Sequence, residues 1–169
     1  MKKYKLCFFV LFFSLLSCVK QSPQLPSNKG ILIDENVTSM LMINQKLALR
    51  EDSVLYQFVR NDKSFKKSEL GFWYKIHHTS SNAFIKDKDK CKFSYQLTFL
   101  DGKLVDQSEI QLVVGQKQIV VGLEEGLKLI SKGDSATFII PWYLGFGMTG
   151  DKKNVPPYKS LIYIIKVNK

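Results

Sequence analysis

Hydrophobic residues recur at intervals of mostly three and four positions between residues 35 and 60, which indicates amphipathic helix. Polar Asn44 interrupts this series, so the pattern predicts one helix or two, with Asp52 or Ser53 as the cap of a second one. Such a segment can pack on its own domain, pair with a second copy of the chain as a homodimer, or bind a partner. We favour packing on its own domain or a role as a simple spacer. The series consists of Val37, Met40, Ile43, Leu47, Val54, Leu55 and Phe58.

Beyond Gly71 the hydrophobic pattern changes to a period of two, which is typical of half-buried β-strands. Residues 72–76 and 92–99 show it first, and Asp101-Gly102 then predicts a type I′ hairpin turn followed by a return strand over 103–106. Further strands are expected at 110–114, 136–140 and 161–167.

One short helix is predicted among these strands, over residues 122–130. Leu123, Leu127 and Ile130 share one face, and Glu124 and Glu125 lie in the first turn, where the helix dipole favours acidic groups. Strands with a single short helix indicate an antiparallel α+β domain and not a doubly wound parallel sheet.

The N-terminus has the pattern of an export signal. A head with three lysines precedes an apolar run over residues 6–17, which is shorter than the about 20 residues of a membrane-spanning helix. The run ends in Leu15-Leu16-Ser17-Cys18, which resembles a bacterial lipobox with Cys18 as the lipidated first residue of the mature chain. Several acyl chains anchor a protein firmly. The alternative is an ordinary secreted protein that is cleaved nearby.

Composition and charge fit an exported globular domain. The chain has 169 residues, 45% of them hydrophobic, and a formal net charge of +10. An exported protein has little access to the genome, so we read the positive charge as a solubility feature and expect no nucleic-acid partner. Residues 18–34 are rich in Pro, Ser, Gln and Asn, which predicts a flexible tether. No acidic run follows Cys18, which favours lipid anchoring in the bacterial envelope facing the periplasm.

The three cysteines have separate expected fates. Cys7 leaves with the signal, Cys18 carries the lipid, and Cys91 remains alone. No intramolecular disulfide can form in the mature chain, so the fold has to be stabilised by its hydrophobic core.

Residues 70–169 resemble FKBP-type peptidyl-prolyl isomerases in the order and spacing of their motifs. With the lipobox, the helical segment and Gly71-Phe72-Trp73-Tyr74, the whole chain resembles the FKBP-type lipoproteins associated with bacterial gliding motility. The motif residues are Tyr95; residues 101–106; residues 114–127; Lys132 and Gly133; Ile140 and Pro141; residues 145–150; residues 155–157; and Leu161.

The resemblance implies an antiparallel half-barrel sheet wrapped around one short helix, with a proline-binding pocket between them. The expected organisation is a signal peptide over 1–17, the tether over 18–34, the helical segment over 35–66 and the isomerase domain over 70–169. The resemblance further implies a set of catalytic residues and a set that binds substrate. The catalytic set is Asp106, Tyr95 and Phe146, and the substrate-binding set is Val105, Ile110, Ile119, Val120, Leu123 and Tyr163.

Amide resonance makes the X-Pro bond slow to rotate, with a barrier of about 18–20 kcal/mol. An apolar pocket favours the twisted, less polar amide, so this chemistry requires no nucleophile, metal or cofactor. The expected activity is therefore isomerisation of X-Pro bonds in exported proteins that are folding, including those of a gliding apparatus.

Two residues depart from the pattern of the family: Val105 stands where the family favours phenylalanine, and Phe146 stands where it favours tyrosine. The alternative is a weakly active or non-catalytic client-binding or scaffold module that uses the same pocket.

Overall fold

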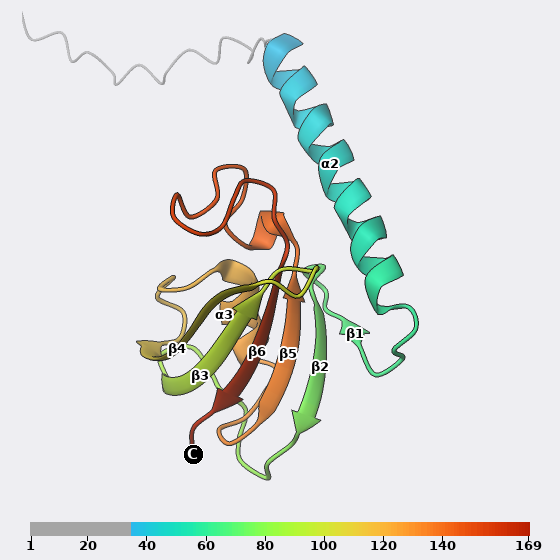
Figure 1. Cartoon of the computed structure of the whole chain (residues 1–169). Coiled ribbons are helices and arrows are strands. Elements are labelled where there is room, and N and C mark those ends of the chain that lie inside the picture. The colour runs from blue at the N-terminus through green and yellow to red at the C-terminus, as the bar shows by residue number, and fades with distance from the viewer. Residues whose placement is uncertain (1–34) are drawn as a thin grey trace, which may run out of the picture. The chain divides into compact units, whose positions relative to one another are not determined.

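The computed structural model describes residues 35–169, and the predicted signal peptide, Cys18 and the tether lie outside them. Within residues 35–169, two α-helices, one short 3-10 helix and six strands follow one another (Figure 1). In order, these elements are α2 (Glu35–Val59), β1 (Lys66–Lys67), β2 (Trp73–His78), β3 (Lys90–Thr98), β4 (Leu104–Val113), α3 (Val121–Leu127), β5 (Ser135–Ile140), η1 (Trp142–Leu144) and β6 (Leu161–Val167).

The six strands form one antiparallel sheet in the order β1-β2-β5-β6-β3-β4. The sheet curves around α3, which lies against its inner face (Figure 1). This arrangement confirms the predicted α+β fold with a curved antiparallel sheet around one short helix.

Two glycines allow α3 to lie very close to strand β5. A Cβ atom on Gly126 would come within 2.7 Å of Phe138 Cε1, and one on Gly122 within 2.5 Å of Ile140 Cγ2. Both distances are shorter than real Cβ atoms tolerate, so larger residues would push the helix away from the sheet. Leu123, which lies between the glycines, is fully buried in the main core.

Helix α2 is a single helix and not two. Asp52 and Ser53 lie inside it, where the Ser53 hydroxyl donates to the backbone oxygen of Leu49, so neither residue caps a second helix. A separate hydrophobic cluster joins the end of α2 to the sheet, in which Leu55 and Val59 pack against Ile139 of β5. The helical segment ends at Val59, and residues 66–67, at the boundary of the predicted segment, form strand β1 instead.

The hairpin between β3 and β4 differs from the predicted type I′ turn. That turn needs a positive φ at both central residues, but Gly102 has a φ of +84° while Asp101 is not among the residues with positive φ. Gly102 N–H donates to the Phe99 oxygen, so Leu100 and Asp101 occupy the centre of the turn and glycine follows it. The Asp101 carboxylate accepts the N–H of Lys103 and stabilises this geometry.

Strand β4 runs without interruption where the sequence pattern predicts two separate strands. Its residues from Leu104 to Val113 pair with β3 except Val105, which is skipped at an irregularity beside Thr98. Most residues of β4 are exposed, and its middle carries polar side chains on both faces. The alternating hydrophobic pattern of a half-buried strand is therefore missing there, and the sequence does not show one continuous strand.

Cys91 on β3 is almost fully buried, and burial raises the pKa of its thiol to about 11. A thiol with such a pKa is rarely ionised at neutral pH and is a poor nucleophile.

Among the described residues, no helix has the length and apolar character to cross a membrane.

Candidate functional site

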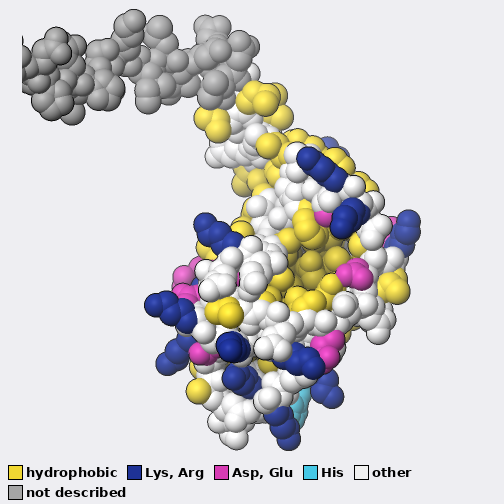
Figure 2. All heavy atoms as spheres, turned by 90° about the vertical axis from the view of Figure 1, so that its left-hand side faces the viewer, with side chains coloured by type: hydrophobic (Ala, Val, Ile, Leu, Met, Phe, Trp, Pro, Cys, Tyr) yellow, Lys and Arg dark blue, Asp and Glu magenta, His cyan; other side chains and the backbone are white. Residues whose placement is uncertain are grey.

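A cavity of about 380 Å³ opens between the sheet, the start of α3 and the loop from β5 to β6. Figure 2 shows hydrophobic side chains gathered in a hollow on the face turned toward the viewer, with charged side chains around it. The residues that line the cavity are Tyr95, Ile110, Lys117, Gln118, Ile119, Val120, Leu123, Phe146 and Tyr163.

Three buried or half-buried side chains from different elements form the interior of the cavity. Leu123 comes from α3, Tyr163 from β6 and Tyr95 from β3, and the two tyrosine rings lie 5.8 Å apart between centroids. Tyr163 is 5% exposed, and burial raises its pKa well above the ordinary value for tyrosine, so it stays neutral at physiological pH. The interior therefore offers apolar surface without a formal charge.

The opposite walls come from β4 and from the loop between β5 and β6. Ile110 contributes the β4 wall, and Phe146 lies on the loop, where both residues are half-buried and pack against the main core. Phe146 carries no hydroxyl, so this wall is entirely apolar.

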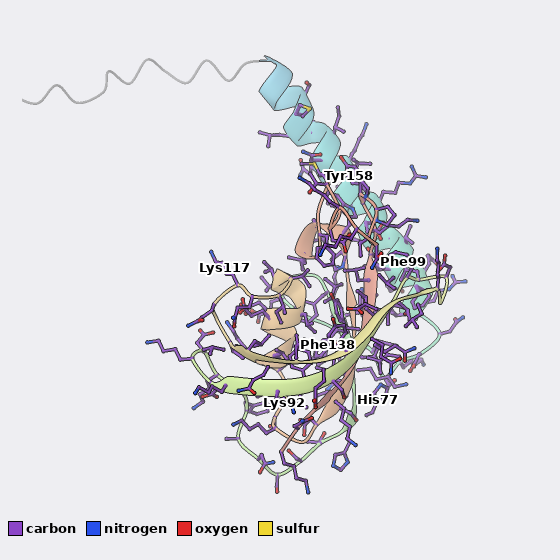
Figure 3. All side chains as sticks on the ribbon, turned by 60° about the vertical axis from the view of Figure 1, so that its left-hand side comes forward. His77, Lys92, Phe99, Lys117, Phe138 and Tyr158 are labelled. Carbon is purple, nitrogen blue, oxygen red and sulfur yellow. The ribbon has the colours of Figure 1, made fainter. Side chains whose placement is uncertain are left out.

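Glu124 fixes the loop that leads into α3. It is 5% exposed, and one of its carboxylate oxygens accepts the N–H groups of Gly115 at 2.8 Å and Lys117 at 3.1 Å. Lys117 has a φ of +54°, and Figure 3 shows it on this loop beside α3. Gln118 adds a second tie, because its side-chain oxygen accepts the N–H of Val113 at 2.9 Å.

Val120 supplies a backbone donor at the cavity. Its carbonyl accepts the N–H groups of Leu123 and Glu124, as expected at the residue before a helix. Its own N–H makes no hydrogen bond within the described part of the chain. A ligand carbonyl in the cavity can accept from this group.

Asp106 does not line the cavity but binds the wall residue Tyr95 through a hydrogen bond. The Tyr95 hydroxyl donates to Asp106 Oδ2 at 2.5 Å, and Asp106 Oδ1 accepts the N–H of Gln107. Burial, followed by the hydrogen bond to Asp106, raises the pKa of Tyr95 to about 12. The contact holds the tyrosine ring in one orientation and keeps its proton on the phenol oxygen.

The structure brings seven of the nine pocket residues implied by the resemblance around one cavity. Val105 and Asp106 do not line it: Val105 packs at the edge of the main core, and Asp106 touches the wall residue Tyr95. Sequence reasoning missed Lys117 and Gln118 as lining residues, although both lie in the motif over 114–127. It also read Glu124 as a helix-dipole residue and missed its contact with the loop.

The sequence profile of the family described as "FKBP-type peptidyl-prolyl cis-trans isomerase" matches residues 81–168. A probable FKBP-type peptidyl-prolyl cis-trans isomerase of Haemophilus influenzae is 33% identical over 112 residues, which cover 62% of this chain and 45% of the relative. The isomerase FkpA of Buchnera aphidicola is 28% identical over 172 residues, which cover 91% of this chain and 67% of that protein. The chain spans less than half the length of the Haemophilus relative.

Solved structures show the same fold. The crystal structure of FkpA from Escherichia coli matches 100% of this chain and 82% of its own, with a TM-score of 0.63 and 23% identity. A peptidyl-prolyl isomerase from Pseudomonas syringae matches 74% of this chain and 93% of its own, with a TM-score of 0.65 and 16% identity.

The pKa of Tyr95 predicts a pH dependence of stability. Below pH 10 the phenol is neutral in both the folded and the unfolded chain; between pH 10 and about 12 it ionises mainly in the unfolded chain. The free energy of unfolding should therefore fall across this window, and the fall should be smaller in Tyr95→Phe. Urea unfolding at a series of pH values measures it. Tyr56→Phe, at an exposed tyrosine on α2, is the control, and identical pH dependence in wild type and Tyr95→Phe would contradict the prediction.

Proposed function

This chain belongs to the family of FKBP-type peptidyl-prolyl cis-trans isomerases, and we propose that its cavity accelerates rotation about X-Pro bonds of folding proteins. The carrying observation is the apolar cavity around Leu123, whose walls are Tyr95, Tyr163 and Phe146. A proline ring fits such a site because it is compact and has no N–H that would need a partner.

The cavity lowers the rotation barrier by favouring the twisted amide over the planar one. A planar amide is polar through resonance, and it loses part of that polarity when it twists. Transfer from water into an apolar cavity therefore disfavours the planar ground state more than the twisted transition state. The free N–H of Val120 holds one substrate carbonyl, which fixes the chain on one side of the rotating bond.

Asp106 and Tyr95 contribute orientation and local charge. The hydrogen bond to Asp106 fixes the Tyr95 ring as a cavity wall, and the carboxylate places a negative charge close to the site. The fixed ring keeps this wall of the cavity in place while the amide twists, so the site does not have to rearrange during the rotation.

Phe146 makes the activity weaker than that of a site with a hydroxyl at this position. One missing hydrogen bond typically lowers binding by about 0.5–1.5 kcal/mol. The second candidate function is client binding with little turnover: it is favoured if the missing donor would have bound the twisted amide more strongly than the planar one, because its loss then lowers turnover more than binding.

Removal of the Asp106 charge tests the proposal directly. The variant Asp106→Asn should lower kcat/KM for cis-to-trans relaxation of short X-Pro peptides about tenfold, because the carboxylate and its contact with Tyr95 are altered. The matched control is Asp101→Asn, the same chemical change on the turn of the same hairpin, where the side-chain oxygen still accepts the N–H of Lys103.

No acceleration by the wild-type chain with any preceding residue would contradict the isomerase proposal and leave the binding module. Equal activity in wild type and Asp106→Asn would contradict the role given to Asp106 alone.

We also propose that the chain is anchored by lipid on Cys18 in the bacterial envelope, facing the periplasm. The support is the sequence around Cys18, with its basic head, short apolar run and small residue before the cysteine. A Cys18→Ser variant should lose its acyl groups and leave the membrane fraction, because the apolar run is too short for stable spanning. Metabolic labelling with a fatty acid and membrane fractionation measure both effects. Equal labelling of Cys18→Ser and Cys7→Ser would contradict the proposal.

Exported proteins with X-Pro bonds are the proposed clients, including components of a gliding-motility apparatus. The support is the resemblance of the whole chain, from the lipobox to the end of β6, to lipoproteins associated with gliding. In cells that lack this chain, wild type should restore gliding, and Asp106→Asn should restore less when both proteins reach equal levels. Full restoration by Asp106→Asn would show that the isomerase step is not needed by those clients.

A further inference from the structure

The loop between β5 and β6 holds Phe146 at the cavity through two hydrogen bonds to one carbonyl. The N–H of Gly145 donates to the Trp142 oxygen at 3.1 Å, and the N–H of Gly147 donates to the same oxygen at 2.9 Å. These glycines are the immediate neighbours of Phe146 in the chain. The position of the phenylalanine therefore follows the position of the Trp142 carbonyl.

The backbone of Trp142 is in turn held, through its own N–H, by Ser160 at the other end of the loop. The backbone N–H of Trp142 donates to Ser160 Oγ at 3.1 Å, and Ser160 is 4% exposed. The Ser160 hydroxyl donates its own hydrogen to Glu51 Oε1 of α2. A serine hydroxyl has one hydrogen to donate, so this contact orients its lone pairs toward Trp142.

Asp52, the next residue of α2, holds the loop at a second point. The Tyr143 hydroxyl donates to Asp52 Oδ1 at 2.5 Å, and Lys67 Nζ lies 3.5 Å from Asp52 Oδ2. Burial, followed by the contact with Asp52, raises the pKa of Tyr143 well above its ordinary value, so the phenol keeps its proton. Two consecutive acidic residues of α2 thus bind both ends of the loop that carries Phe146.

We propose that Glu51 and Asp52 are positioning residues of the proline site: they tie α2 to the loop over residues 141–160 and thereby hold Phe146 against the cavity. The inference rests on the proposed function for its effect on substrate, whereas the tie between helix and loop is a separate physical statement. It gives α2 a part in substrate binding, although none of its residues lines the cavity.

Packing alone predicts a different result. Leu55 and Val59 attach α2 to β5 through the hydrophobic cluster with Ile139, and this attachment does not involve the loop. If Glu51 served only to attach the helix, its loss would lower stability throughout the sheet. If Glu51 positions the loop, its loss acts on Gly145, Phe146 and Gly147 first.

The expected kinetic effect is on KM. As a wall of the proposed proline site, Phe146 would contact the ring whether the amide is planar or twisted, so its displacement would remove binding that is common to ground state and transition state. The loss of one hydrogen bond to a charged acceptor corresponds to a rise in KM of about tenfold, with kcat changed less than twofold.

The experiment compares variants of the full-length chain in mild detergent. Glu51→Ala removes the acceptor, Glu51→Gln keeps a side-chain oxygen at the same place, and Arg50→Ala changes an exposed charge at the neighbouring position of the same helix. Isomerisation of an X-Pro peptide gives KM and kcat. Hydrogen exchange by NMR gives the protection of the Gly145 and Gly147 amides against that of the β3 and β6 amides.

The proposal expects Glu51→Ala to raise KM and to speed exchange at Gly145 and Gly147 about tenfold, while the β3 and β6 amides stay within twofold of wild type. Arg50→Ala should resemble wild type in both measurements, and Glu51→Gln, which keeps an acceptor oxygen without the charge, should lie between wild type and Glu51→Ala. Ser160→Ala, which removes the bridge between Glu51 and Trp142, should reproduce Glu51→Ala.

Three results would overturn the proposal: unchanged exchange at the two glycines, faster exchange by the same factor throughout the sheet, or faster local exchange with an unchanged KM. If the wild-type chain has no isomerase activity, the proposed function fails by itself. The dissociation constant of the same peptide then replaces KM, and the exchange measurement still decides the role of Glu51.

Discussion

The absence of side chains at Gly122 and Gly126 lets helix α3 lie against strand β5, and the cavity depends on this contact. A Cβ atom at either position would meet Ile140 or Phe138 at less than 3 Å. With the helix at this depth, Leu123 is buried between the two glycines and still contributes to the cavity. A larger separation would turn the site into an open groove, because its walls on β3, β4 and β6 are fixed by the sheet.

Two loops complete the cavity, and a carboxylate from a helix holds each of them. Glu124 of α3 accepts two backbone N–H groups from the loop before its own helix. Glu51 of α2 binds Ser160, and through it the loop that carries Phe146. Hydrogen bonds to charged acceptors are stronger than neutral ones, which suits irregular loop backbone that no strand pairing holds in place.

Much of the fold was predictable because its signals are local. Alternating residues in β3 and the apolar run in β6 mark buried strands, and Leu123 and Leu127 mark the inner face of α3. The prediction of a type I′ turn was wrong because the turn type depends on how the flanking strands pair, and the dipeptide Asp101-Gly102 does not encode that pairing. The site was accessible only through the resemblance, because the lining residues also suit any β-domain core. The ties from Glu124 and Glu51 join distant or irregular backbone, and no spacing in the sequence reveals them.

The buried thiol of Cys91 on β3 can report unfolding of the domain through its reaction with an alkylating reagent. Of its three cysteines, Cys7 and Cys18 lie in the N-terminal part outside the described residues, and Cys91 is 1% exposed. Its thiol becomes available to an alkylating reagent only when the core around β3 opens, since Cys91 belongs to the main hydrophobic core and pairs with Leu112 of the edge strand β4. In a chain whose other thiols are removed or acylated, the rate of alkylation would therefore follow the rate or extent of opening of the domain. Clients or peptides that bind the folded cavity would slow that reaction by mass action, so their affinity becomes measurable without any assay of proline rotation.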